Sequence, residues 1–125
     1  MIDFTNGSFI KLKQIDPGKI MNDINPLLIS GEGIISAYKG IRDYVVFTDK
    51  RVISVNAQGI TGKKRDYTSM PYSKISVFSV ETSGVLDLDS ELEMYFSGVG
   101  KVKFEFTGRS DIVEIGHIIA EYALK

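Results

Sequence analysis

Cysteine is absent from this 125-residue chain, and histidine occurs once, at His117. A chain without cysteine can form no disulfide, thiol nucleophile or cysteine-ligated metal site. A single histidine excludes a multi-histidine metal site and leaves little material for a nucleophile and base that act together. We therefore predict that the protein is not an enzyme, and we expect no catalytic residue, metal or cofactor.

Long apolar runs and a large excess of charge of one sign are also lacking. The longest apolar runs have about four residues, such as residues 44–47, whereas a membrane-spanning helix needs about 20. The first residues do not have the basic and apolar regions of a signal peptide, so we expect a cytoplasmic protein. The formal net charge of −1 argues against a general nucleic-acid-binding protein, and no nucleic-acid partner is expected.

The composition that is present is typical of one globular domain, with 43% hydrophobic and 25% charged residues. Asp16 and Pro17 are suited to cap and begin a short helix, which Pro26 would end near Asn25. The first ten or so residues carry the weakest structural pattern, and residues 6–8 indicate a turn or a loose end.

Strands and turns alternate from residue 31 to residue 107. We predict strands at residues 34–39, 42–48, 51–56, 66–72, 74–82, 91–96 and 101–106. In the last two, apolar and polar residues alternate, which indicates an antiparallel sheet with one face on a core. Across that hairpin, Glu91 and Glu93 are expected to face Lys101, Lys103 and Glu105.

An amphipathic helix is predicted over residues 110–124, where isoleucines recur at helical spacing. Together with the strands, it predicts a mainly β fold. The expected architecture is a bent antiparallel sheet or partly open barrel of about seven strands. A C-terminal α-helix would cap this sheet, and a short helix would precede it.

The predicted strand at residues 74–82 changes the phase of its apolar residues. Ile75 and Val77 belong to one face, and Phe78 and Val80 belong to the other. Two explanations are open. Either a β-bulge shifts the register of the strand, or both faces of the strand are buried, in which case a neighbouring molecule can cover one of them.

Seven strands followed by a helix form the order of the pleckstrin-homology (PH) architecture, and the chain resembles the bacterial PH-domain family in particular. The segments that carry the resemblance are residues 38–53, 58–64, 69–75, 78–84 and 87–92. They follow the family's order and spacing, and the match extends over roughly residues 28–124. We therefore expect an N-terminal segment with a short helix at residues 1–27 and a bacterial PH-like domain at residues 28–125. The resemblance implies a non-enzymatic protein that forms ring-like homo-oligomers and has no defined cellular role.

The charges divide into two regions along the chain. Residues 39–74 contain eight cations and three acids, and residues 81–93 contain five acids and no cation. Regions of opposite charge on one small molecule suit head-to-tail contacts, which close into rings when the rotation allows. The leading hypothesis is therefore an interaction module that assembles with itself, with a protein partner as a further candidate. Its candidate contact residues are Ile75, Val77, Phe78, Val80, Glu81, Asp87 and Asp89.

The alternative hypothesis is a monomeric recognition domain that binds an anionic membrane surface or an acidic peptide. Its candidate residues are Lys39, Arg42, Lys63, Lys64 and Arg65. Specific binding of phosphoinositides is not expected, because the first hairpin of the PH-like domain offers only Lys39 and Arg42, with Asp43 beside them. The acids of residues 87–91 do not have the spacing or the glycine of a calcium loop, so they predict no metal site.

Overall fold

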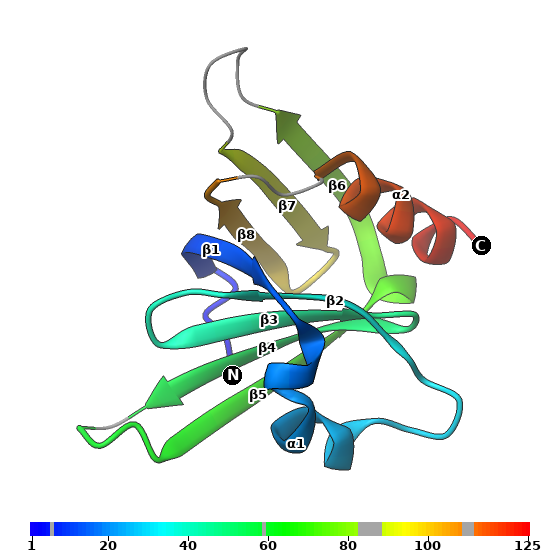
Figure 1. Cartoon of the computed structure of the whole chain (residues 1–125). Coiled ribbons are helices and arrows are strands. Elements are labelled where there is room, and N and C mark those ends of the chain that lie inside the picture. The colour runs from blue at the N-terminus through cyan, green and yellow to red at the C-terminus, as the bar shows by residue number, and fades with distance from the viewer. Residues whose placement is uncertain (6, 59, 83–88, 109–111) are drawn as a thin grey trace.

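The computed structural model describes the chain except residues 6, 59, 83–88 and 109–111 (Figure 1). The described residues form a mainly β fold with short helices near the N-terminus and one longer helix near the C-terminus. In chain order, the elements are β1 (Gly7–Ile15), η1 (Pro17–Lys19), α1 (Met21–Ile24), η2 (Asn25–Leu27), β2 (Ile34–Lys39), β3 (Asp43–Thr48), β4 (Arg51–Gln58), β5 (Lys64–Pro71), η3 (Tyr72–Lys74), β6 (Ile75–Thr82), β7 (Ser90–Phe96), β8 (Gly100–Phe106) and α2 (Ile112–Ala123).

The strands form one curled sheet in the order β5-β4-β3-β2-β1-β8-β7-β6. Strands β2–β5 make one part of it, strands β6–β8 make another, and β1 joins the two (Figure 1). Neighbouring strands are antiparallel, except that β1 and β8 run parallel. The predicted bent sheet with a C-terminal helix is thus confirmed, and β1 adds a strand to the seven predicted.

Strand β1 corrects the expectation that the start of the chain has little structure. Its buried apolar residues are Phe9 and Leu12, which are three positions apart. That spacing arises because the pairing with β8 shifts register between these two residues, where Lys11 has a φ of 55°. The irregularity removes the two-residue period by which a strand is recognised in a sequence.

The main core lies on the inner face of the sheet, which is the face that α2 covers. Ile115, Ile118 and Ile119 of α2 pack there against buried residues of most strands. Tyr38 and Phe106 meet edge to face, with ring centroids 4.8 Å apart. The predicted alternation in the last two strands is confirmed, because the residues of this core include Leu92, Met94, Phe96, Val102, Phe104 and Phe106.

A second, smaller core lies on the outer face of the sheet. The N-terminal helical segment, which consists of η1, α1 and η2, packs there. Asp16 caps that segment as expected, accepting a hydrogen bond from the Gly18 amide at 3.0 Å. Ile20 and Ile24 then pack on strands β2–β4. Strands β3 and β4 are therefore buried on both faces, which explains their nearly continuous apolar sequences. The residues of this outer core are Ile20, Ile24, Ala37, Tyr44, Val46, Ile53 and Val55.

The phase change in β6 is explained by a register irregularity between Ile75 and Val77 in the pairing with β7. Ile75, Phe78 and Val80 are partly buried against the main core. Val77 points away from it and is 62% exposed. Of the two explanations for this strand, the structure therefore supports the bulge, and within one chain only one face of β6 packs on a core.

Candidate functional site

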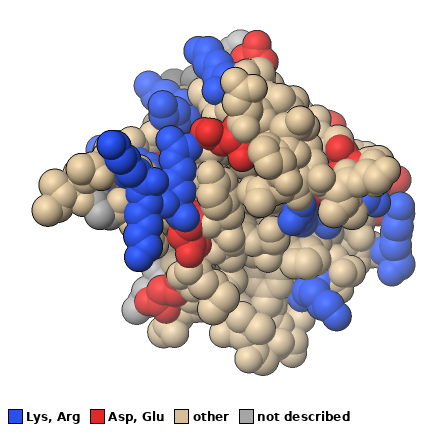
Figure 2. Space-filling view, turned by 90° about the horizontal axis from the view of Figure 1, so that it is seen from below, with Lys and Arg blue, Asp and Glu red and all other residues tan. Residues whose placement is uncertain are grey.

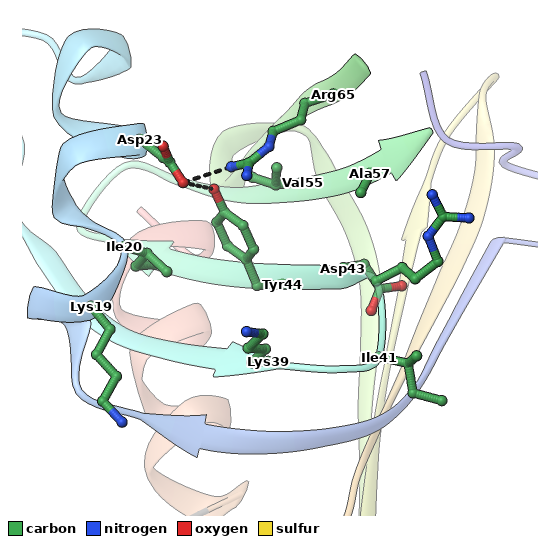
Figure 3. Close-up of a pocket in the computed structure, with 11 residues that line it drawn as sticks. Lys19, Ile20, Asp23, Lys39, Ile41, Asp43, Tyr44, Val55, Ala57 and Arg65 are labelled. Carbon is green, nitrogen blue, oxygen red and sulfur yellow. Dashed lines mark hydrogen bonds and ion pairs between the residues drawn. The ribbon is translucent and has the colours of Figure 1, made fainter. Parts of the chain in front are cut away.

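A pocket opens on the outer face of the sheet, between the N-terminal helical segment and strands β2–β5 (Figure 3). Its volume is about 270 Å³. The helical segment packs against the outer face of the sheet because Ile20 and Ile24 are buried in the outer core. The lining therefore combines residues from η1 and α1 with residues from the β2–β3 and β4–β5 hairpins.

Four cations and two carboxylates line this outer pocket and leave a net charge of +2: Lys19, Lys39, Arg42, Arg65, Asp23 and Asp43. Three of the predicted anion-binding residues, Lys39, Arg42 and Arg65, are thus brought together. The other two, Lys63 and Lys64, are exposed nearby but do not line the pocket. Sequence reasoning missed Lys19, because it lies 20 positions before Lys39 and outside the segments that carry the family resemblance.

Asp23 links three elements at one side of the pocket (Figure 3). Its Oδ2 atom lies 2.6 Å from Nη1 of Arg65 on β5 and accepts a hydrogen bond from the Tyr44 hydroxyl at 3.3 Å. Burial, assisted by the negative charge of Asp23, raises the pKa of Tyr44 to about 12. The Arg65 and Asp23 side chains are 39% and 44% exposed, so an incoming ligand can reach both.

Asp43 is the first residue of β3 and follows the tight turn that joins β3 to β2. The Gly40 amide donates a hydrogen bond to the Asp43 carbonyl at 2.8 Å. A Cβ atom on residue 40 would overlap the Asp43 carboxylate, so a larger residue there would have to displace this side chain. Burial raises the pKa of Asp43 above its ordinary value. The setting of Asp43 is therefore unfavourable for a negative charge.

Two exposed isoleucines lie at neighbouring loop tips, and sequence reasoning missed both; Ile41 also lines the pocket, whereas Ile60 does not. Ile41, in the β2–β3 turn, is 79% exposed, and Ile60, between β4 and β5, is fully exposed. The two hairpins meet where the Ala57 amide donates a hydrogen bond to the Arg42 carbonyl at 3.0 Å. In the view from below, several basic side chains lie next to one another at the left of the molecule, and others lie at the top and right (Figure 2). An isolated isoleucine between polar turn residues was the signal available in the sequence.

The predicted self-association residues lie mainly on β6, an edge strand. Ile75, Phe78 and Val80 pack inward, whereas Val77 and Glu81 are exposed. Strand β6 pairs with β7, and no described strand pairs with its other edge. Asp87 lies outside the described residues.

The remaining acids of the predicted acidic region have partners within the chain. Asp89 accepts hydrogen bonds from the Thr107 hydroxyl at 3.0 Å and the Gly108 amide at 3.1 Å. As predicted, Glu93 pairs with Lys101 at 3.3 Å and Glu91 with Lys103 at 3.1 Å. Much of the negative charge expected to meet another molecule is therefore balanced within the hairpin.

Two kinds of site can be tested directly in the part of the chain that is described. No group of three or more acidic or histidine side chains there is arranged to hold a metal ion. No described helix has the length and apolar character needed to cross a membrane. The candidate binding surfaces that remain are the outer pocket, the loop tips with Ile41 and Ile60, and the edge of β6.

Comparison with known proteins gives consistent matches over nearly the whole chain. A family model described as the bacterial PH domain matches residues 3–123. The uncharacterized protein YjqA of Bacillus subtilis is 40% identical over 119 residues, which cover 94% of this chain and 95% of that protein. A crystal structure of a pleckstrin-homology domain protein from Shewanella loihica has a TM-score of 0.78 and 36% identity, covering 91% of this chain and 98% of that one. A PH domain from Shewanella amazonensis has a TM-score of 0.66 and 43% identity, covering 89% and 90%.

Proposed function

The chain belongs to the bacterial PH domain family, and from that premise we propose that it is a non-enzymatic interaction module that self-associates through the open edge of β6. The observation that carries this proposal is the unpaired edge of an eight-residue strand at the end of the sheet. Such an edge presents backbone N–H and C=O groups that can pair with another chain. Strand β6 contains no proline and only one charged residue, Glu81.

The two edges of the sheet differ in how well they are protected. Strand β5, at the other edge, ends in Pro71 and begins with Lys64 and Arg65, which are residue types that discourage edge pairing. The Ile2 amide also donates a hydrogen bond to the Thr68 hydroxyl of β5 at 3.2 Å. Strand β6 has an irregularity near its start and packs against α2, but no described strand pairs with its outer edge, and residues 77–82 keep a regular register with β7. The exposed Val77 therefore lies on a strand that is suited to a partner.

The contact should depend on backbone pairing and apolar burial more than on charge. Glu91 and Glu93 are already paired with lysines of β8, which leaves Glu81 as the exposed acid on β6. Exposed ion pairs contribute little and are screened by salt. We therefore expect the assembly to persist at high ionic strength, unlike one held by opposite charged regions.

Light scattering behind a sizing column tests the β6 contact through two matched variants. Val77 and Val99 are both 62% exposed, but Val99 lies in the β7–β8 turn and not on a sheet edge. A Val77→Lys chain should run near the monomer mass of 13.9 kDa. The Val99→Lys chain should keep the mass of the unsubstituted assembly. Equal masses for the two variants would contradict an interface at β6.

A second candidate function is docking on an anionic bilayer, and the two loop tips favour it. Ile41 and Ile60 are the kind of exposed apolar side chains that can enter the lipid interface. Lys39, Arg42 and Lys63 lie in or beside the same loops. Each basic residue near an anionic lipid surface contributes about 1 kcal/mol. The tips therefore combine an apolar and an electrostatic attraction.

Co-sedimentation with vesicles of phosphatidylserine and phosphatidylcholine tests this second candidate. Lys63→Glu/Lys64→Glu should abolish binding, and Ile60→Ser should weaken it without changing the net charge. Lys50→Glu/Lys74→Glu is the control, because it changes the net charge by the same amount at the opposite end of the strands. There the Tyr72 amide of η3 donates a hydrogen bond to the Lys50 carbonyl. Equal loss in both double variants would indicate attraction by net charge and no docking surface.

A further inference from the structure

Residues 1–5 form a strap that runs from β5 to the start of β8 and packs against the main core. We propose that the surface beneath it, the strap site, also binds residues 1–5 of a second copy of this chain in exchange for its own strap. Exchange between copies rests on the self-association proposed above, whereas binding of the segment is measurable with a peptide, whatever the mass of the protein. The strap site consists of Gly7, Asp66, Thr68, Phe96, Gly100 and Lys101.

Backbone and apolar groups of the strap both contact the strap site. The Ile2 amide donates a hydrogen bond to the Thr68 hydroxyl at 3.2 Å, and the Phe4 carbonyl accepts one from the Lys101 amide at 2.8 Å. The Ile2 and Phe4 side chains are partly buried against the main core. The Phe4 ring meets Phe96 edge to face, with ring centroids 5.8 Å apart. The site therefore fits an extended segment with apolar residues at its second and fourth positions.

A charged contact fixes the start of the segment. The Met1 ammonium group forms an ion pair with the Asp66 carboxylate, whose side chain is 26% exposed. This ammonium group and the Thr68 hydroxyl together hold the pKa of Asp66 below its ordinary value. A segment that begins with a free amino group therefore meets a carboxylate held in its charged form.

Gly7 shows how closely the strap fits. A Cβ atom on residue 7 would lie 2.6 Å from the Asp3 carbonyl oxygen and 2.7 Å from Cγ2 of Ile2. The φ angle of Gly7 is not positive, so its backbone conformation does not itself require glycine. Gly33 has no positive φ either, but a Cβ atom there would meet nothing within 4 Å. Glycine at position 7 therefore makes room for the strap, and position 33 offers a matched control.

The strap is held by few contacts and can leave its site at low cost in free energy. Met1 is 84% exposed, Asp3 and Thr5 are exposed, and only Ile2 and Phe4 are partly buried. A second copy carries the same segment, so exchange replaces each contact with an identical one. A tethered segment competes at an effective concentration on the order of millimolar. Copies held together in one assembly supply their straps at a comparable concentration.

Tryptophan fluorescence tests the exchange, because the chain contains no tryptophan and Phe4→Trp then reports on the strap alone. The peptide MIDFT, at millimolar concentration, stands for the strap of a second copy. It should displace the strap and shift the emission to longer wavelength as the indole enters water. The peptide MSDST, which lacks both apolar residues, should leave the emission unchanged. N-acetylated MIDFT, which lacks the positive charge, should act more weakly than MIDFT.

Variants of the Phe4→Trp chain separate the strap from its site. Ile2→Ser weakens only the strap, so MIDFT should act at a concentration lower by about threefold or more. Ile29→Ser, at a residue that is 60% exposed and outside the strap, should leave that concentration unchanged. Gly7→Ala obstructs the site for strap and peptide alike, so the emission should start at longer wavelength and not respond to MIDFT. Gly33→Ala should behave like the Phe4→Trp chain itself.

Hydrogen exchange at the Lys101 amide gives a second readout in chains that keep Phe4. Exchange should be faster in Ile2→Ser than in the unsubstituted chain, and MIDFT should slow it again by restoring a carbonyl partner. The proposal is overturned if MIDFT at several millimolar neither shifts the emission nor slows this exchange, if MSDST acts equally, or if Gly7→Ala responds to MIDFT as Gly33→Ala does. A monomer mass together with binding of MIDFT would support the strap site and contradict only the β6 assembly.

Discussion

At the scale of single residues, Glu32 is an acid that the fold holds in its charged form. Its side chain is fully buried and ties the loop before β2 to the start of β4. The carboxylate accepts a hydrogen bond from Nε of Arg51 at 2.9 Å and another from the Thr48 hydroxyl at 2.7 Å. Burial alone would raise the pKa of Glu32, but hydrogen bonds from Arg51, Thr48 and the Ile29 amide together lower it below its ordinary value of 4.5. The charged form is therefore the one that the fold stabilises.

Replacing Glu32 with glutamine should lower the free energy of unfolding by about 1–3 kcal/mol at neutral pH, because a buried charge-assisted network is lost. A carboxylate with a lowered pKa contributes stability above its unfolded pKa and loses it as the pH falls through the folded value. The difference between Glu32→Gln and the unsubstituted protein should therefore shrink below a pH of about 4.5. Urea unfolding across this range measures it, with the exposed Glu121→Gln as the control. A difference that stays constant with pH would contradict the assigned role of the Glu32 charge.

Gly100 begins β8 with a φ of 141°, in direct contact with the N-terminal segment. The Lys101 amide donates a hydrogen bond to the Phe4 carbonyl at 2.8 Å, and a Cβ atom on residue 100 would overlap that carbonyl. Gly98, in the same turn, also has a positive φ, but a Cβ atom there would meet nothing within 4 Å. The two glycines therefore separate the effect of backbone conformation from the effect of close packing.

Gly98→Ala should cost about 1 kcal/mol of unfolding free energy, because alanine disfavours a positive φ. Gly100→Ala should cost at least about 1 kcal/mol more, since it must also displace Phe4. Thermal or urea unfolding of both variants makes the comparison. Equal losses of unfolding free energy in the two variants would contradict a tight contact between the Phe4 segment and Gly100.

At the scale of elements, the N-terminal helical segment forms one wall of the outer pocket by packing against the sheet. Ile24 is fully buried in the outer core, whereas Met21, in the same short helix, is 37% exposed. So short a helix has little stability of its own and depends on packing. The burial of Ile20 and Ile24 therefore positions Lys19 and Asp23 over the strands.

Ile24→Ala should lower the free energy of unfolding by about 2–4 kcal/mol, as expected for a large cavity in a core. Met21→Ala should change it by less than about 1 kcal/mol, because this side chain is partly in solvent. Urea unfolding gives both values. Similar values for the two variants would show that the segment does not depend on the packing of Ile24.

Most elements could be predicted from the sequence where a regular period was present. Residues 92–96 and 102–106 alternate strictly, and both became strands with one face on the core. Strand β1 could not be predicted in this way, because its register shifts between Phe9 and Leu12. The phase change in β6 was visible, but the choice between a bulge and burial on both faces needed the position of Val77.

At the scale of the whole molecule, the family and the fold were visible in the sequence, and the pocket was visible only in part. Lys39, Arg42 and Arg65 stood out as cations of one region, and the two hairpins bring them together. Lys19 and Asp23 come from a distant helical segment, so only folding places them in the same site. The pairing of Glu91 and Glu93 with lysines was also predicted, and it weakens the expectation of assembly through opposite charges.

Self-association through an apolar edge is the central claim, and the native mass in solution tests it most directly. Light scattering behind a sizing column would be recorded in about 0.1 M salt and again in about 1 M salt, where surface charges are strongly screened. We predict a mass of several subunits at both salt concentrations. A monomer mass of 13.9 kDa at both concentrations would contradict self-association, and dissociation only at high salt would contradict the apolar β6 contact in favour of one held by charge.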